Sequence, residues 1–469
     1  MPHLASQNWE PQLYQRLDQL IKNHQQQRDT PLAQKNYVVF DFDHTSIFND
    51  IEDHTMVYTA AHLAYQLTPT EMENCLKQNK AALDQAISDQ APQISFQELI
   101  DDIIADYQKL YPQRDNYQRS QKSLEDRLEA DPLLFNFFCK IRTFYLAYNQ
   151  RFPKQAGASC PSFLYQNFTE ADFVDLGKKA LAYGLRAPIK DFTWTYSLSG
   201  DPRQCLSTHF SQGLRIPNEL IKLYQSLHTA GIATYIVSAS PQSLVETAVK
   251  YFYPIDPPEI IGMSYKQDEA GSYQAQLESH APITKAAGKV QAIQELIQPR
   301  HQDREPLAVF GDSMGDYQMF QAFSPSTTRV LFNRLLNDKT QDFVSQAQKE
   351  YAKPKQVYFI QGRDNNTGAL RPSQETIPFG QDQAYLSQAI NQWECDSHTK
   401  DEIAGENWDK LSETERYQFL KRTFVLWLEH VLIRLFVFWK ESESFVPDSL
   451  ISRQGWIHLV SEFLPLTSG

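Results

Sequence analysis

The chain has 469 residues, 41% of them hydrophobic and 12% aromatic, which is enough to bury the cores of roughly two to four domains and argues against a disordered protein. Its formal net charge of −13 argues against a general nucleic-acid binder and against a protein that binds anionic membranes. A small anionic ligand stays compatible with this charge, because a bound metal ion can reverse the local field.

The cysteines indicate a reducing environment. Five of them are present, odd in number and widely spaced, so we expect unpaired thiols rather than disulfides or a zinc site. The amino terminus lacks a basic start followed by an apolar core, and the apolar stretch 424–439 is too short and too charged to span a membrane. We expect a cytoplasmic protein without a membrane span, while export stays open because a removed signal peptide would leave the same pattern.

Two helical segments surround the first strand. Residues 1–36 are predicted to form a helical lead-in, because apolar residues recur there at helical spacing. Residues 49–214 again have helical periodicity, and an insertion of that length must be a domain with its own core. Its predicted helices are Met56–Leu67, Pro69–Gln85, Phe96–Leu110 and Leu133–Tyr148.

From about Ile216 the pattern changes to alternating strands and helices, which predicts a parallel sheet with right-handed crossovers. The sheet domain would comprise residues 37–48 and 215–390, followed by a helical extension over 391–469. Its predicted strands are Tyr37–Phe40, Ala233–Val237, Glu259–Met263, Leu307–Phe310, Arg329–Phe332 and Val357–Ile360, with helices at Pro217–Ala230, Pro241–Phe252 and Gly288–Ile297 and a hairpin at Tyr265–Leu277.

The end of the first strand carries the chemistry. Asp41 and Asp43 follow the apolar run Tyr37–Phe40 directly, at the edge where α/β sheets bind ligands. Two carboxylates at i and i+2 of an extended segment share a side, and they repel each other unless a cation lies between them. This arrangement suggests a Mg²⁺ site in which one carboxylate is free to attack a substrate.

Four ordered motifs resemble those of the haloacid dehalogenase-like (HAD) phosphatases. They are DFDHTS at Asp41–Ser46, IVSAS at Ile236–Ser240, GK at Gly288–Lys289 and FGDSMGD at Phe310–Asp316. The resemblance implies an α/β fold: a Rossmann-like parallel sheet, a large helical cap (residues 49–214) inserted after the first core strand, and helical extensions at both ends. It covers the sheet domain and says little about residues 391–469.

The resemblance also implies a role for each motif residue. Asp41 would attack phosphorus and form an aspartyl-phosphate, and Asp43 would act as general acid and then as general base. Ser238 would hydrogen-bond the phosphoryl group, while Lys289 would offset the negative charge around it. The Mg²⁺ ligands would be Asp41, the backbone carbonyl of Asp43, Asp312 and Asp316, with Asp316 either a ligand or a partner of one.

The position of the insertion resembles the phosphoserine phosphatase-like branch, and a second set of matches resembles a phosphorylcholine phosphatase-like group. These matches are NDIED (Asn49–Asp53), GLRIP (Gly213–Pro217), YIVSASP (Tyr235–Pro241), IIGM (Ile260–Met263) and QGRDNNTG (Gln361–Gly368). The substrate implied is a small phosphorylated metabolite with a cationic head, with phosphocholine and phosphoethanolamine as candidates.

Five residues outside the motifs are candidates for binding the substrate. Asp50 and Glu52 would attract a substrate cation, Trp194 and Tyr196 would offer ring faces to it, and Arg215 would steady a phosphate. Each has a structural alternative, because aromatic residues in a helical domain mostly form its core and acidic residues are mostly solvated.

Other functions fit the same sequence. A phosphoserine-like phosphatase or a phosphotransferase would use the same motifs, and a regulatory or binding protein could keep a vestigial HAD core. The carboxy-terminal extension carries an apolar stripe that would either pack on the same chain or join two copies, so the protein is expected to be a monomer or a homodimer. The stripe consists of Phe424, Leu428, Val431, Leu432, Leu435 and Phe438.

Overall fold

The chain divides into two units, Met1–Ala389 and Ile390–Gly469. The computed structural model describes residues 4–5, 7–120, 122–152, 160–198, 205–253 and 259–387, all of which belong to the first unit. The predicted helical extension over residues 391–469, with its apolar stripe, therefore lies outside the described residues. Among the described helices, none is long and apolar enough to cross a membrane.

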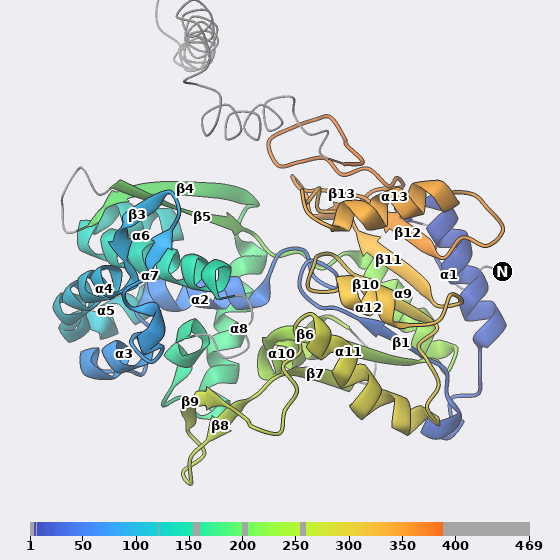
Figure 1. Ribbon diagram of the computed structural model, residues 1–469, viewed down its shortest axis with the longest axis horizontal. Coiled ribbons are helices and arrows are strands. Elements are labelled where there is room, and N and C mark those ends of the chain that lie inside the picture. The colour runs from blue at the N-terminus through green and yellow to red at the C-terminus, as the bar shows by residue number, and fades with distance from the viewer. Residues whose placement is uncertain are drawn as a thin grey trace, which may run out of the picture. The chain divides into compact units, whose positions relative to one another are not determined.

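A six-stranded parallel sheet forms the centre of the first unit, in the order β12-β11-β10-β1-β6-β7 (Figure 1). This sheet confirms the predicted α/β fold class. Every predicted core strand is present, with ends that shift by a few residues at most. The bounds are β1 Tyr37–Phe40, β6 Ala233–Pro241, β7 Glu259–Met263, β10 Ala308–Gly311, β11 Thr328–Phe332 and β12 Tyr358–Gln361.

Strand β1 lies in the middle of the sheet, between β6 and β10. Val39 pairs with Tyr235 on one side and with Val309 on the other. All four residues of β1 are buried, which is the continuous apolar pattern of a parallel strand covered on both faces. Because these strands are parallel, the residues that follow β1, β6 and β10 all emerge at one edge.

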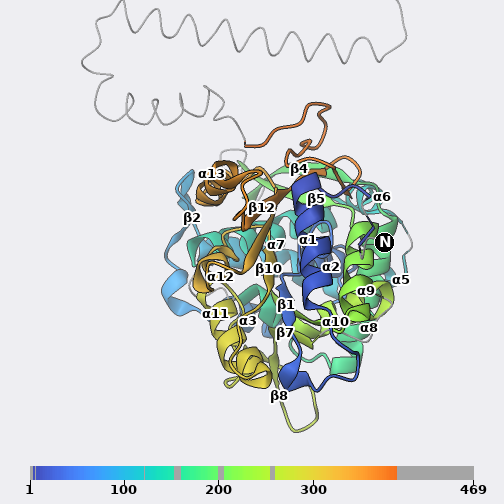
Figure 2. The ribbon, with the colours of Figure 1, turned by 90° about the vertical axis from the view of Figure 1, so that its right-hand side faces the viewer.

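Helices cover both faces of the sheet (Figure 2). Val38 and Phe40 pack in a cluster with α1, α9 and α10, while Tyr37 and Val39 pack with α11, α12 and α13. The three-layer arrangement follows from the alternation of side chains along the strand. The bounds are α1 Pro11–His24, α9 Asn218–Thr229, α10 Gln242–Phe252, α11 Ala287–Ala292, α12 Tyr317–Ala322 and α13 Thr340–Glu350.

The insertion between β1 and β6 has an apolar cluster of its own. Helix α4 has the predicted bounds, and it begins at a capping box in which Ser95 and Glu98 each bind the other's backbone N–H. The helices are α2 Ile51–His62, α3 Pro69–Leu76, α4 Phe96–Leu110, α5 Arg114–Arg119, α6 Leu124–Ala130, α7 Pro132–Arg151 and α8 Glu170–Arg186.

Two predictions for the insertion are corrected by the structure. Helix α2 ends at His62 rather than Leu67, because Leu63 adopts a left-handed conformation with φ 47° that closes the helix. Helix α3 ends at Leu76 rather than Gln85, and the strands β2 (Ala86–Ser88) and β3 (Ala91–Ser95) follow it.

The insertion is also not wholly helical. Strands β4 (Lys190–Ser197) and β5 (Cys205–Gln212) pair in antiparallel register. The sequence of β4 carries the signal for a strand, since Phe192, Trp194 and Tyr196 alternate with exposed polar residues.

A second hairpin, β8 (Tyr265–Gln267) and β9 (Tyr273–Leu277), follows β7 in the sheet domain, as predicted. It reaches the insertion: Asn167 N donates to the carbonyl of Tyr273 at 2.9 Å, and Tyr273 N donates to the carbonyl of Phe168 at 2.8 Å. Thr169 and Ser272 form an antiparallel bridge beside these bonds. The hairpin therefore joins the sheet domain to the insertion in addition to the two chain crossings.

Candidate active site

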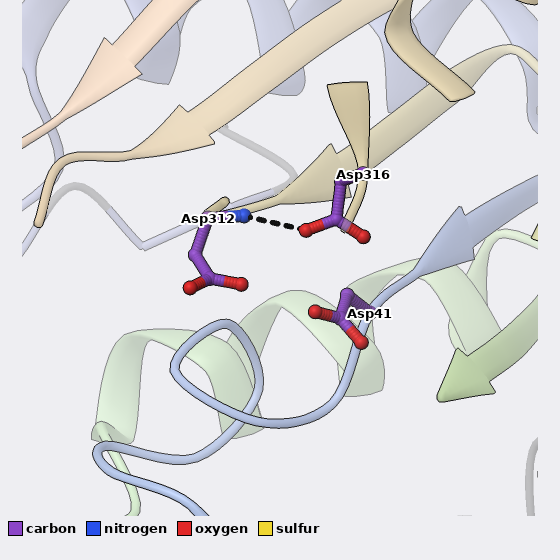
Figure 3. A group of neighbouring side chains, drawn as sticks. All are labelled: Asp41, Asp312 and Asp316. Atoms are coloured by element: carbon purple, nitrogen blue, oxygen red, sulfur yellow. Dashed lines mark hydrogen bonds between the residues drawn. The ribbon is translucent and has the colours of Figure 1, made fainter. Parts of the chain in front are cut away.

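Three carboxylates meet at the carboxyl edge of the sheet (Figure 3). Asp41 follows β1, Asp312 follows β10, and Asp316 precedes α12. One oxygen of each lies within 4.8 Å of the others, and the side chains are buried, with 6%, 3% and 0% of the residue surface exposed. Residues separated by more than 270 positions in sequence are thus brought together by the pairing of β1 with β10.

Asp41 is held by two donors. The Lys289 ammonium lies 2.7 Å from its Oδ1, and the backbone N–H of Phe42 donates to the same atom at 2.7 Å. Burial, followed by the neighbouring Asp316 carboxylate, raises the pKa of Asp41 well above its ordinary value, while Lys289 acts in the opposite direction. A cation near Asp41 would therefore favour the ionised form that a nucleophile requires.

Lys289 connects two of the aspartates, with Nζ 2.7 Å from Asp41 and 2.6 Å from Asp316. Burial alone would lower its pKa, but Asp316 and Asp41 together raise it, so the side chain is a fixed positive charge. Only glycine fits at position 288, directly before Lys289, because a Cβ there would lie 1.6 Å from the carbonyl oxygen of Ile283.

Asp316 organises the loop after β10. Its Oδ1 binds Lys289, and its Oδ2 accepts the backbone N–H groups of Asp312 at 3.0 Å, the bond drawn in Figure 3, and of Ser313 at 3.3 Å. Gly311 allows this approach, since a Cβ there would lie 2.5 Å from the Asp316 side chain. Both carboxylate oxygens thus have protein donors already.

Both carboxylate oxygens of Asp43 accept hydrogen bonds. Its Oδ1 accepts the N–H of Ile51 at 2.7 Å, and its Oδ2 accepts the hydroxyls of Ser240 at 2.7 Å and Ser238 at 3.3 Å. Burial raises the pKa of the Asp43 carboxyl. Sequence reasoning named Ser238 but missed Ser240, although the two alternate along β6 and so share one side of the strand.

Arg334 is a second residue that sequence reasoning missed. It lies just after β11, and its guanidinium donates to Oδ2 of Asp312 at 2.7 Å. Its position after the end of a predicted core strand is the signal that could have identified it. Among the described residues, Arg334 and Lys289 are the cations in ion-pair contact with Asp41, Asp312 and Asp316.

The donor set fits a hard divalent cation. Four buried or half-buried carboxylates, from Asp41, Asp43, Asp312 and Asp316, are matched by two cationic side chains, Lys289 and Arg334. The remaining negative charge and the oxygen ligands are those that Mg²⁺ prefers. Asp41 and Asp312 could bind such an ion directly, while the bonds of Asp316 suit it to orienting Lys289.

A cavity of about 250 Å³ opens beside these carboxylates. It is lined by Asp41, Asp43, Lys289 and Asp312 and by residues of the insertion and of the segment around the β8–β9 hairpin, which together are called its wall here. The wall residues are Asp50, Glu52, Tyr145, Asn149, Met263, Tyr265, Leu277 and Lys285. A larger groove of about 860 Å³ lies on the insertion, but none of the aspartates lines it.

The wall formed by the insertion is acidic. Asp50 caps α2 by accepting the N–H of Asp53 at 2.8 Å, and burial followed by Asp43 raises its pKa well above the ordinary value. Asp50 and Glu52 line the cavity, whereas Asp53 does not line it and pairs with the buried Arg142. The sequence predicted that both Asp50 and Glu52 face the substrate.

The other three predicted substrate-binding residues lie elsewhere. Trp194 stacks on Phe192, with ring centroids 4.8 Å apart, and Tyr196 is buried in the apolar cluster of the insertion. The Arg215 guanidinium binds the backbone carbonyls of Leu214 at 2.6 Å and Ala187 at 3.0 Å, which fixes the return crossing from the insertion. None of the three lines the cavity. Strand β4 packs the rings of Trp194 and Tyr196 against the apolar cluster of the insertion, while backbone carbonyls hold the Arg215 guanidinium.

Part of the chain is similar to one known family. The family model described as haloacid dehalogenase-like hydrolase matches residues 164–321. No curated protein matches the chain.

Solved structures resemble the fold. A conserved protein of unknown function from Anaerococcus prevotii is 24% identical over 81% of this chain and 99% of its own, with a TM-score of 0.69. A phosphoserine phosphohydrolase-like protein from Francisella tularensis is 14% identical over 63% of this chain and 87% of its own, with a TM-score of 0.26. The first of these similarities supports the fold alone.

Proposed function

We propose that this chain, whose residues 164–321 match the haloacid dehalogenase-like hydrolases, is a phosphatase that hydrolyses small phosphomonoesters through a covalent intermediate on Asp41. The observation that carries the proposal is the buried Asp41 carboxylate, held 2.7 Å from Lys289 and grouped with Asp312 and Asp316 beside a small cavity. A carboxylate so placed can attack, and its neighbours can stabilise the charge of the transferring group.

In the first step, an oxygen of Asp41 attacks phosphorus and the bond between phosphorus and the ester oxygen breaks. The leaving alkoxide takes a proton from Asp43, whose raised pKa favours the protonated form that a general acid needs. Ser238 and Ser240 hold this carboxyl in position through their hydroxyls.

In the second step, water attacks the phosphorus of the aspartyl-phosphate, and Asp43 accepts the proton of that water. The bond between Asp41 and phosphorus breaks, which releases phosphate and restores the carboxylate. Lys289 stays 2.7 Å from Asp41 and 2.6 Å from Asp316, so its charge offsets that of the phosphoryl group in both steps. A bound Mg²⁺, held by Asp41, Asp312 and the backbone carbonyl of Asp43, would add Lewis-acid stabilisation of the phosphoryl oxygens.

The acidic wall supports a substrate with a cationic head. Asp50 and Glu52 line the same cavity as the nucleophile, and so does Tyr145 of α7. A cation held by carboxylates and a ring face is the recognition expected for phosphocholine or phosphoethanolamine. Tyr145 would offer the substrate cation the ring face that the sequence suggested for Trp194 and Tyr196. Phosphoserine and phosphotransfer to another acceptor are the alternatives.

The test replaces Asp41 with Asn and measures hydrolysis of p-nitrophenyl phosphate in Mg²⁺. We expect the rate to fall to that of the buffer, while thermal unfolding stays cooperative. Replacing the exposed Asp84 of the insertion with Asn is the matched control and should leave the rate unchanged. Acid-quenched wild-type protein should also gain the mass of one phosphoryl group during turnover. Full activity of the Asp41→Asn protein would refute the proposal.

A panel of phosphocholine, phosphoethanolamine and phosphoserine then tests the cationic head. Phosphocholine or phosphoethanolamine should be hydrolysed with a higher kcat/KM than glycerol 3-phosphate, which has no cation. Equal kcat/KM values for cationic and uncharged leaving groups would mean that Asp50 and Glu52 do not bind a substrate cation. The phosphatase proposal would still stand.

A further inference from the structure

Lys285 is a lysine of the cavity that the four motifs do not include. It lies in the loop between the β8–β9 hairpin and α11, four residues before Lys289, and its side chain lines the same cavity as Asp41. The residue is half-buried, and its ammonium makes no hydrogen bond or ion pair with any residue that the structure describes. A lysine in such a place gives up hydration without gaining a hydrogen bond in return.

Lys285 shares the cavity with two carboxylates. Asp50 and Glu52 belong to α2 and its cap, on the insertion, whereas Lys285 belongs to the sheet domain. Burial lowers the pKa of Lys285 below its usual value, and the Glu52 carboxylate opposes this shift. The cavity thus offers two carboxylates from the insertion and one ammonium from the sheet domain.

From this arrangement we propose that Lys285 is a specificity-determining residue that binds a carboxylate on the leaving group of the substrate. The inference rests on the proposed phosphatase function and, over phosphocholine and phosphoethanolamine, favours phosphomonoesters whose leaving group carries a carboxylate. A single carboxylate suits this place better than a second phosphate. The single Lys285 ammonium balances the one negative charge of a carboxylate. A second phosphate carries more negative charge, and Asp50 and Glu52, which also line this cavity of about 250 Å³, would repel it more strongly.

Two pairs of substrates test the proposal, because the members of each pair differ by a carboxylate. Phosphoserine is compared with phosphoethanolamine, and 3-phosphoglycerate with glycerol 3-phosphate. The first pair carries an amine and the second does not, so the pairs separate a zwitterionic from a purely anionic leaving group. Wild-type protein should prefer the carboxylate in at least one pair.

The Lys285→Met variant should lower kcat/KM for the preferred carboxylate substrate by about 10- to 100-fold, the loss expected for a charged hydrogen bond, and leave its partner without the carboxylate within about twofold. Lys285→Arg should restore much of the preference. Lys266→Met, the same change at an exposed lysine of β8, is the matched control and should alter neither substrate.

An equal loss for both members of each pair, or for p-nitrophenyl phosphate as well, would overturn the proposal and make Lys285 a contact that holds the insertion in place. The absence of any carboxylate preference in the wild-type protein would overturn it too. Neither result would affect the phosphatase proposal, which depends on the Asp41→Asn variant alone.

Discussion

Asp43 and Ile51 are joined by a hydrogen bond of 2.7 Å, in which the first backbone N–H of α2 donates to the Asp43 carboxylate. The proposed acid and base of the reaction is therefore fixed by the helix that begins the insertion. Because Asp50 precedes the same helix and lines the cavity, a movement of α2 would shift the proton donor and the acidic wall together.

Replacing Asp43 with Asn should affect alkyl phosphates more than aryl phosphates. Asn keeps an acceptor for Ile51 but has no proton to give, and general acid catalysis is worth about 100- to 10,000-fold. We expect a loss of this size in the rate of aspartyl-phosphate formation from phosphoethanolamine and a much smaller loss in that rate for p-nitrophenyl phosphate, whose leaving group needs no proton. Steady-state turnover should fall for both esters, because Asp43 also activates the water of the second step. Equal losses in the rate of the first step would contradict the role of Asp43 as the acid.

Removal of divalent metal should abolish activity and lower thermal stability. The carboxylates of Asp41, Asp312 and Asp316 are buried within 4.8 Å of one another, so an added cation relieves their repulsion. Differential scanning fluorimetry should show a Tm that rises with Mg²⁺ for the wild-type protein. The Asp312→Asn variant should lose most of this rise, and a rise of the same size in that variant would place the ion elsewhere.

The buried His54 ring should make the stability of the protein depend on pH. Its Nε2 accepts the N–H of Gly213 at 3.0 Å and its Nδ1 lies 2.7 Å from the carbonyl oxygen of Asp50, so only the neutral ring satisfies both bonds. Burial lowers the pKa of His54 from 6.5 to about 4. Between these values the unfolded chain binds a proton that the folded chain excludes, so stability falls as the pH falls from 6.5 to 4.

The contribution of His54 to this fall amounts to about 3 kcal/mol at pH 4. Urea unfolding between pH 4 and 7 should show a shallower dependence for His54→Gln than for the wild-type protein. Part of the slope should persist in the variant, because burial lowers the pKa of His62 to about 4 as well. Identical slopes in the two proteins would mean that His54 is not buried as a neutral ring.

The β8–β9 hairpin should control access to the cavity. It binds residues 167–169 of the insertion through backbone hydrogen bonds, while Tyr265 and Leu277 at its base line the cavity wall. A disulfide between Thr169→Cys and Ser272→Cys would hold this contact closed. We expect kcat to fall at least about tenfold on oxidation and to recover with a reductant, as for other closing elements.

The single variant Thr169→Cys is the control for the hairpin, because Thr169 also caps α8 and its loss alone costs about 1 kcal/mol of stability. If the oxidised double variant keeps full activity, the hairpin and the insertion stay together during turnover.

Tyr145 and Trp194 should respond differently to replacement. Tyr145 lines the cavity, so Tyr145→Leu should raise KM for an amine substrate by about tenfold, the size of one ring contact with a cation. Trp194→Leu should lower the unfolding temperature and leave KM unchanged, because its ring packs on Phe138 and Phe192. The opposite pattern would mean that Trp194, rather than Tyr145, contacts the substrate.

Much of the fold follows from local patterns. The bounds of α4 and β7 were predicted to the residue, since capping residues and apolar runs report the state of the segment that contains them. The alternation of Phe192, Trp194 and Tyr196 also indicates a strand, but the helical character of the surrounding insertion concealed it. Here the local signal was sound and the assumption about the domain was wrong.

The residues of the site were likewise only partly predictable from the sequence. The sequence determined that Asp41, Asp43, Lys289, Asp312 and Asp316 follow strands or begin helices whose ends meet, and it placed Asp50 and Glu52 nearby. Only the tertiary structure brought Ser240, Arg334, Tyr145 and Lys285 to the cavity and turned Trp194, Tyr196 and Arg215 away from it. The physical reason is that periodicity tells which face of its own element a side chain occupies, whereas the partner of that face is decided by how separate elements pack.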